Sequence, residues 1–324
     1  MIHIAAMLKE ENTIPSNENI RSVLSSMTGN NPVLIQRLPT GDQNFVFAVS
    51  TSETEYVLRM TSLQNKHKFE SAIKWQQMLL PLGIPLAEFI HKDIDGKLSP
   101  FSSLLMMRLP GSDLINIYQN LSDSDKKNLA LEMIHIQSLC NKLPEGKGFG
   151  ILNSYDDPNY SDTWFDFILN RLIFCKEEIE QAGVFSNEYL LKALKILEGF
   201  KTNFQTITAR PFLWDASERN VLVKNGKISG IVDVDEICFG DPLLVIALTS
   251  ICLELEGYDT KYSDYWASNL QLGNSSQQRL NFYKLFYSVA FMRKHGITTK
   301  NQKQLQFNTK ILQAIYSRAL ARLT

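Results

Sequence analysis

The stretch that decides the fold runs Leu213-Trp-Asp-Ala-Ser-Glu-Arg-Asn220-Val-Leu-Val-Lys-Asn-Gly-Lys-Ile-Ser-Gly-Ile-Val-Asp233-Val-Asp-Glu-Ile-Cys-Phe-Gly240-Asp-Pro242. Two short apolar runs, 221–223 and 228–232, flank Asn225-Gly226, a sequence typical of a two-residue β-hairpin turn. The hairpin places Asn220 at the start of one strand and Asp233 at the end of the other. The two ends of a hairpin meet at one edge, so these side chains are expected to lie together.

Asp215 lies in the loop that enters this hairpin, within reach of the same edge. Two carboxylates and an amide supply oxygen ligands, which Mg²⁺ prefers while keeping waters and substrate phosphates in its other positions. A base beside Mg²⁺ suits phosphoryl transfer, which depends on positioning and charge neutralisation. Asp and Asn also flank turns with no function. The second Asp and the following Gly240-Asp241-Pro242 favour the metal site over that simpler interpretation.

These motifs resemble the aminoglycoside phosphotransferase family, which carries a His-Gly-Asp-x4-Asn loop and an Ile-Asp…Gly-Asp-Pro segment. The resemblance runs from about Leu38 to Trp266, and within the family the motifs are most similar to those of the hygromycin B phosphotransferases. Besides the hairpin, it rests on four shorter matches: Leu38-x-x-Gly41, Tyr56-Val-Leu-Arg59, Gly148-Phe-Gly150 with a following Trp164, and Asn220-Val-Leu. Leu213-Trp214 stand where the family has His-Gly, which reshapes the approach to Asp215 and leaves the substrate open.

The pattern outside this stretch predicts an α+β fold with segregated lobes. Short β-branched and aromatic runs predict an antiparallel five-stranded sheet, at 33–38, 45–49, 56–60, 86–90 and 104–109, with one helix at 66–80. Beyond Pro110-Gly111 the pattern is mainly helical, at 122–142, 162–182, 186–206, 242–256, 276–295 and 301–322. The resemblance implies a bilobal protein-kinase-like fold, with residues 1–109 as a nucleotide-binding lobe (1–31 an extension carrying a short helix at 19–27) and 110–324 as a helical catalytic lobe with a small β-hairpin.

The resemblance also implies a role for each residue of the motifs. Asp215 accepts or orients the proton of the substrate hydroxyl, and Asn220 and Asp233 hold Mg²⁺ against the phosphates of ATP or GTP. Arg59 stands where kinases carry a phosphate-binding lysine, and Glu70 is its expected partner; the alternative is a surface salt bridge worth at most about 1 kcal/mol.

Three further positions complete the expected nucleotide site. The loop containing Gly41 would cover the phosphates, although a single glycine in a hairpin turn needs no function. Met107 and Leu109 would offer backbone groups to the adenine edge, although an ordinary edge strand would have the same sequence.

A surface rich in acidic residues follows the predicted site. The candidate substrate residues are Asp235, Glu254, Glu256, Asp259 and Trp266. Acidic groups favour a cationic substrate by charge complementarity, and aromatic rings suit sugar rings or cation–π contact. The alternatives are that Asp235 aids the metal or faces solvent, and that the other acids form a solvated turn with the aromatic rings packed inward.

The composition excludes several other classes of protein. The 324 residues carry 33 Lys and Arg against 34 Asp and Glu, a net charge of −1, so nothing indicates a nucleic-acid or membrane partner. The four cysteines lack metal-ligand spacing and predict reduced, buried thiols. The first residues do not form a secretory signal and no apolar run reaches the ~20 residues of a membrane span, so we expect a cytoplasmic protein.

We therefore expect a small-molecule kinase that phosphorylates a hydroxyl of an aminoglycoside-like or other amine-bearing metabolite, with antibiotic resistance as one possible role. A choline-, homoserine- or methylthioribose-type metabolic kinase and a nucleotide-binding pseudokinase are the alternatives. A hydrolase is disfavoured because the five histidines are scattered and no nucleophile motif is present. The acceptor, the preferred nucleotide and the oligomeric state stay open.

Overall fold

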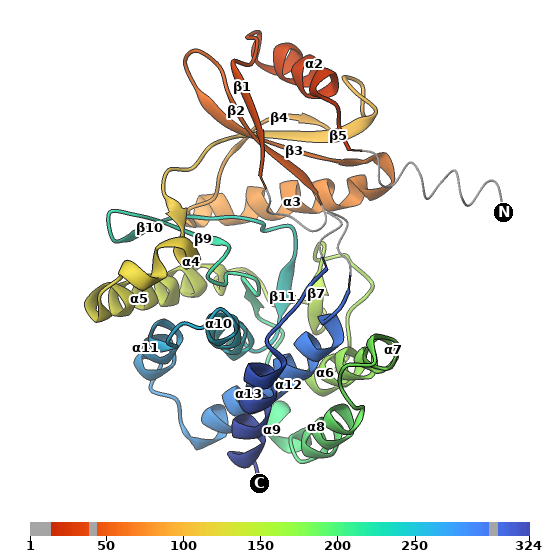
Figure 1. Cartoon of the computed structure of the whole chain (residues 1–324), viewed down its shortest axis with the longest axis vertical. Coiled ribbons are helices and arrows are strands. Elements are labelled where there is room, and N and C mark those ends of the chain that lie inside the picture. The colour runs from red at the N-terminus through yellow and green to blue at the C-terminus, as the bar shows by residue number, and fades with distance from the viewer. Residues whose placement is uncertain (1–13, 39–43, 298–303) are drawn as a thin grey trace, which may run out of the picture.

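The structure, a computed structural model, describes residues 14–38, 44–297 and 304–324 and has two lobes (Figure 1). The upper lobe is built on an antiparallel sheet of order β1-β2-β3-β5-β4. Its strands are β1 (Leu34–Arg37), β2 (Phe45–Ser50), β3 (Glu55–Ser62), β4 (Phe89–Asp93) and β5 (Phe101–Met107). The predicted α+β fold with a five-stranded antiparallel sheet is confirmed.

Two helices pack on the two faces of this sheet. Helix α2 (Asn17–Thr28) buries Ile20 and Leu24 against Leu58 and Met60 of β3, so this part of the expected N-terminal extension belongs to the core of the upper lobe. A Ser16 capping box starts the helix and left-handed Gly29 ends it.

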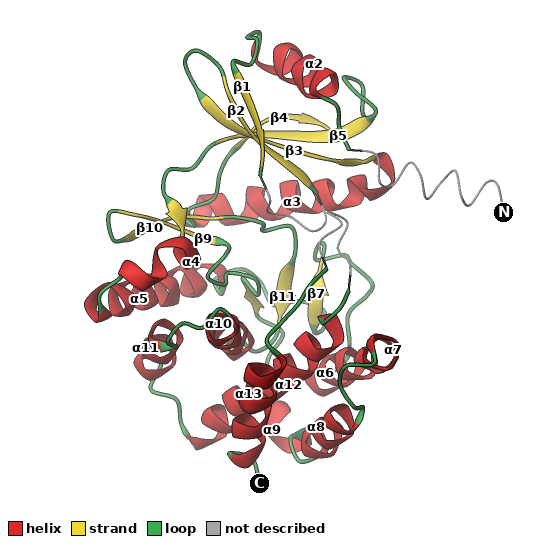
Figure 2. Ribbon diagram, in the orientation of Figure 1, coloured by secondary structure: helices red, strands yellow, loops and turns green. Residues whose placement is uncertain are grey.

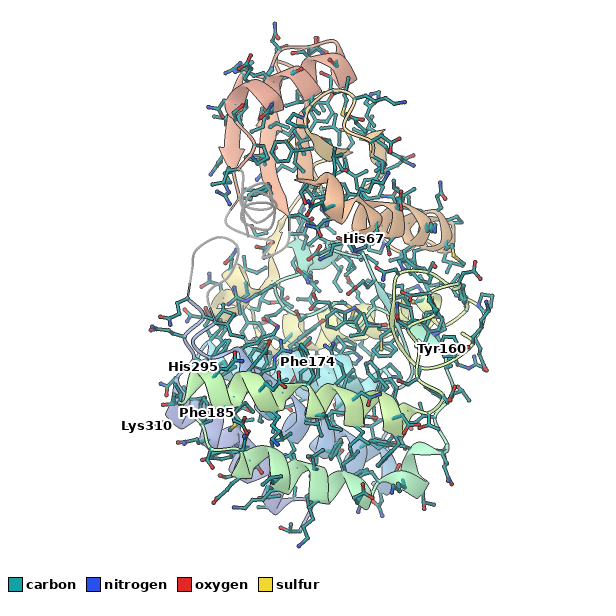
Figure 3. All side chains as sticks on the ribbon, turned by 90° about the vertical axis from the view of Figure 1, so that its right-hand side faces the viewer. His67, Tyr160, Phe174, Phe185, His295 and Lys310 are labelled. Atoms are coloured by element: carbon teal, nitrogen blue, oxygen red, sulfur yellow. The ribbon has the colours of Figure 1, made fainter. Side chains whose placement is uncertain are left out.

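Helix α3 (Lys66–Leu79) lies beneath the sheet and above the lower lobe, and His67, at its first turn, lies at the boundary between the lobes (Figures 1 and 3). Phe69 and Ala72 pack with Leu104 of β5. Trp75 and Leu79, one and two turns later, belong to the hydrophobic core of the lower lobe. This helix therefore joins the two lobes through apolar contacts on both sides.

The lower lobe is mainly helical (Figure 2). Its helices are α4 (Leu114–Ile117), α5 (Asp123–Cys140), α6 (Trp164–Ile173), α7 (Cys175–Ala182), α8 (Glu188–Glu198), α9 (Lys201–Phe204), α10 (Leu243–Leu255), α11 (Lys261–Asn269), α12 (Asn274–Lys294) and α13 (Thr309–Ala321). Two small sheets have the orders β10-β9-β6 and β7-β11-β8. Their strands are β6 (Ser112–Asp113), β7 (Gly150–Leu152), β8 (Pro211–Phe212), β9 (Val221–Lys224), β10 (Lys227–Ile231) and β11 (Ile237–Phe239). Within the described ranges, no helix has both the length and the apolar character that a bilayer crossing requires.

Several element boundaries differ from the sequence prediction. The fourth strand begins at Phe89, because Leu86 instead forms an isolated parallel bridge with Ile231 in the lower lobe. The predicted helices at 162–182 and 186–206 each divide into two. Helix α11 was not predicted, since its polar and aromatic residues give no clear apolar periodicity.

The hairpin of the deciding stretch forms as predicted. Strands β9 and β10 pair antiparallel, and Asn225 and Gly226 between them have φ of 52° and 74°. Both central residues are left-handed, which matches the twist of the flanking strands. The register shifts between Ile228 and Gly230, and the absence of a Cβ at Gly230 leaves room for the side chain of Leu109.

Gly240 allows an indole ring to pack against the Gly-Asp-Pro turn. A Cβ at this position, where φ is 153°, would lie 2.0 Å from Cζ3 of Trp164, which is 1% exposed. Trp164 Nε1 donates to the Tyr283 hydroxyl at 2.7 Å, and this hydroxyl donates to Asp241 at 2.9 Å. Arg279 also donates to Asp241, at 2.7 Å, so Asp241 is held as a structural residue at the start of α10.

We expect Gly240→Ala to destabilise the protein by about 3 kcal/mol, because a buried ring must move and the residue must adopt a left-handed backbone. Urea unfolding of both proteins measures this change. Gly257→Ala is the matched control, since Gly257 has a φ of 80° but nothing within 4 Å of its added Cβ. Its cost should be about 1 kcal/mol; equal costs for the two variants would contradict the packing argument.

Candidate active site

A glutamine side chain from α5 holds the loop that carries Asp215. Leu213 N donates to Gln137 Oε1 at 3.0 Å, and Gln137 Nε2 donates to Leu213 O at 2.9 Å. Leu213 itself is 2% exposed and packs in the core, where the family motif has its histidine. The sequence analysis did not identify Gln137. Its amide lies on the apolar face of a predicted helix, a position that could have indicated a buried structural role.

The structure brings Asp215, Asn220 and Asp233 together at one edge of the hairpin. Asn220 Nδ2 donates to the carbonyl oxygen of Asp215 at 2.9 Å, and the backbone N–H of Val232 donates to Asn220 O at 2.9 Å. The second bond fixes the residue before Asp233 beside Asn220. Asp233 has a φ of 60°, a left-handed conformation that is uncommon outside glycine and that turns the chain back toward the loop.

Asp215 has a raised pKa. Burial and the nearby charge of Asp233 raise the pKa of Asp215 to about 7, while Lys294 and the hydrogen bond with Asn220 oppose this shift. Lys294 comes from the last turn of α12, so sequence reasoning had no local signal for it. A carboxyl group with a pKa near the working pH suits proton transfer.

Asn220 and Asp233 fit the ligands of a Mg²⁺ ion. Because Asn220 Nδ2 donates to the carbonyl oxygen of Asp215, the Oδ1 atom of Asn220 is the one left to bind a metal ion. The Asp233 side chain is 49% exposed, which leaves room for a phosphate and waters. In the described part of the chain no three His, Cys, Asp or Glu side chains gather as a metal site. Two protein oxygens completed by substrate phosphates are usual for Mg²⁺.

Arg59 pairs with aspartates of the lower lobe, which corrects the expected pairing with Glu70. Its guanidinium donates to Asp235 at 2.8 and 2.5 Å and to Asp233 at 3.2 Å. Glu70 is exposed on α3, and the described residues that form ion pairs with Arg59 are these two aspartates. Asp235, a candidate for the metal or for substrate, is thereby engaged by Arg59.

The roles of the other residues expected at the nucleotide stay predictions. Met107 ends β5 and is 44% exposed, and Leu109 is half-buried in the connection to β6. Gly41 lies outside the described residues.

The predicted acidic substrate surface is neutralised by bases. Glu254 pairs with Arg318, and Glu256 pairs with Arg219. Asp259 accepts from Lys126 at 2.8 Å. Trp266 was wrongly expected to face substrate: it is 2% exposed and packs in the core beside Tyr262. The inward-packed alternative is the one the structure shows for this ring.

Part of this surface lines a cavity of about 420 Å³ between α10, α11, α12 and α13. Its acidic residues are accompanied by as many bases. The lining residues are Glu254, Tyr258, Asp259, Thr260, Asp264, Lys284, Ile315, Arg318, Ala319 and Arg322. Asp215, Asn220 and Asp233 are not among them, so this cavity is separate from the hairpin edge.

A second buried acid, Glu218, lies in the same loop as Asp215. Its carboxylate is 0% exposed, and neither oxygen has a hydrogen-bond partner within the described ranges. Arg219 approaches at 3.7 Å. Burial raises the pKa of Glu218 to about 7, and the charge of Asp215 adds to this shift. The sequence analysis assigned no role to Glu218.

The two lobes, the hairpin between them and the gathered oxygen ligands define a kinase-like protein. Residues 35–268 match the model of the phosphotransferase enzyme family. The chain belongs to this family. A search among curated proteins finds no match.

Solved structures of low identity share the fold over nearly the whole chain. One is a thermostable mutant of the aminoglycoside phosphotransferase APH(4)-Ia in a ternary complex with AMP-PNP and hygromycin B (TM-score 0.63, 16% identity, 94% of this chain and 96% of that chain). Another is a putative fructosamine-3-kinase from Haemophilus somnus 129PT (TM-score 0.62, 16% identity, 94% of this chain and 97% of that chain). A third is APH(2'')-IIa in complex with gentamicin (TM-score 0.61, 14% identity, 95% of this chain and 97% of that chain). The resemblance to the hygromycin B enzymes extends to the fold.

We expect Glu218→Gln to stabilise the protein by about 2 kcal/mol near pH 8. The folded state holds the Glu218 proton more tightly than the unfolded chain, so stability falls as pH rises from about 4.5 to about 7. The gain from the neutral amide should therefore mostly disappear near pH 5. Urea unfolding at both pH values measures this difference. Glu53→Gln, at an exposed turn, is the control; a gain that does not change with pH would contradict the prediction.

Proposed function

We propose that the protein is a small-molecule kinase that transfers the γ-phosphoryl group of ATP or GTP to a hydroxyl of an amine-bearing acceptor. The observation that carries the proposal is the meeting of Asp215, Asn220 and Asp233 at the hairpin edge. Family membership supports it, and one of the similar structures holds AMP-PNP.

Asp215 is the proposed base. As the acceptor hydroxyl oxygen forms its bond to the γ-phosphorus, the bond from that phosphorus to the β,γ-bridging oxygen breaks and the nucleoside diphosphate leaves. The hydroxyl proton passes to the Asp215 carboxylate. The pKa of Asp215, raised to about 7, makes this carboxylate a better proton acceptor than an exposed aspartate while leaving much of it ionised at neutral pH.

Asn220 Oδ1 and the Asp233 carboxylate are the proposed Mg²⁺ ligands. When bound, Mg²⁺ neutralises charge on the phosphate oxygens. Arg59 would add a second positive group to the same phosphates, and Met107 and Leu109 would border the adenine.

The acceptor is proposed only as a class. Hygromycin B and gentamicin occur in two of the similar structures, and a third is named for fructosamine. The ion-paired acids beyond α10 give no support to a broad acidic surface that would bind a cationic substrate. The test is a nucleotide-turnover assay with hygromycin B, gentamicin, a fructosamine, choline, homoserine and methylthioribose. Turnover with choline, homoserine or methylthioribose alone would favour the metabolic kinase, and Mg²⁺-dependent nucleotide binding without any turnover would favour a pseudokinase.

We expect Asp215→Asn to lower kcat by about 10²–10⁴-fold while nucleotide affinity changes little. The amide keeps the size of the side chain but accepts no proton at neutral pH. Steady-state kinetics on the best acceptor and calorimetry with Mg²⁺ and AMP-PNP separate the two effects. Unchanged kcat would remove Asp215 from the role of base.

We expect Asp233→Asn to abolish most of the Mg²⁺ dependence of nucleotide binding, because one of the two ligand oxygens loses its charge. The measurement compares AMP-PNP affinity with Mg²⁺ and with EDTA. Asp156→Asn is the control, since its side chain is 91% exposed and pairs with Lys147. If the Asp233 variant kept the full metal dependence, the ion would have to bind elsewhere.

A further inference from the structure

We propose that Asp235, which follows the hairpin in the lower lobe, positions Arg59 for the nucleotide phosphates in place of an acid on α3. This inference rests on the proposed kinase function. It assigns to Asp235 neither metal binding nor substrate contact.

The first argument is the geometry of the pair. Arg59 Nη1 donates to Asp235 Oδ1 at 2.8 Å, and Nη2 donates to Oδ2 at 2.5 Å. The two side chains are 9% and 14% exposed. Two parallel bonds fix the plane of the guanidinium as well as its place. A lysine could not be held in this way, because its ammonium is a point charge.

The second argument is a count of donors. A guanidinium has five N–H groups. Asp235 takes two of them, and Asp233 takes the second hydrogen of Nη2 at 3.2 Å. Among the described residues, the Nε hydrogen and one Nη1 hydrogen have no acceptor and could reach phosphate oxygens. The contact with the half-exposed Asp233 is the longest of the three, so it is the one that metal and phosphate would most readily replace.

The third argument comes from α3, which reaches Arg59 through other groups. The face of Phe69 lies 5.4 Å from the guanidinium carbon, at cation–π range. Ser71 Oγ donates to the backbone oxygen of Asp235 and also lies 2.7 Å from Asn153 O. Helix α3 thus supports Arg59 with an aromatic ring below it and, through Ser71, with the backbone of its acidic partner.

The test compares two neutralised acids. Asp235→Asn should weaken binding of Mg²⁺ and AMP-PNP at least about tenfold and raise the KM for nucleotide more than it lowers kcat. Glu70→Gln should change the affinity less than about twofold, since the Glu70 side chain is exposed. Asp95→Asn, which breaks an exposed ion pair with Lys66, controls for the loss of one acid from the upper lobe. A weakened Glu70 variant beside an unaffected Asp235 variant would overturn the proposal.

The Asp235→Asn variant could fail to fold because it leaves Arg59 buried without its partner. A double-variant cycle keeps the proposal testable in that case. Arg59→Met and the pair Arg59→Met with Asp235→Asn should bind nucleotide equally, because Asp235 acts only through Arg59. A further loss of affinity in the double variant would show a separate role for Asp235 and overturn the inference. Wild-type protein that binds no Mg²⁺–AMP-PNP would overturn the kinase function itself, a result distinct from either of these.

Discussion

The segment Ile231–Asp235 is held from both lobes, and the arrangement of the candidate site depends on it. Ile231 N donates to Pro85 O, in the connection between α3 and β4, at 2.8 Å. Val232 N donates to Asn220 O, and Arg59 from β3 binds both aspartates that follow. Each lobe therefore contributes to the position of Asp233. The conformation of this short segment is therefore determined by contacts with residues that are distant in the sequence.

Burial in a low dielectric explains the raised pKa values of the two acids in the loop before β9. Asp215 and Glu218 are three residues apart, and burial raises the pKa of each to about 7. The charge of Asp233 adds to the shift of the Asp215 pKa, and the charge of Asp215 adds to the shift of the Glu218 pKa. Arg59 supplies positive charge beside Asp233 and Asp235.

The sequence was sufficient for the hairpin and for the strands of the upper sheet, because these depend on local chemistry. Asn225-Gly226 specifies its turn by backbone conformation, and the spacing of apolar residues sets the strands of the upper lobe. The partner of Arg59 could not be found in this way. Glu70 lies four residues after the start of α3, at Lys66, and has the right charge, yet the direction of its side chain is set by how α3 packs. Trp266 and Gln137 likewise take their roles from burial, which local sequence does not determine.

The ion pair of Arg59 with Asp235 also crosses the boundary between the lobes. Arg59 belongs to the central strand of the upper sheet, whereas Asp235 follows the hairpin of the lower lobe. Helix α3 packs into both cores and bonds to Asp235 through Ser71, so the distance between lobes and the place of the guanidinium are linked. A kinase with the acid on α3 would assemble its cation within one lobe. Here the guanidinium of Arg59 and the acid that orients it come from different lobes, so the position of Arg59 depends on how the two lobes pack.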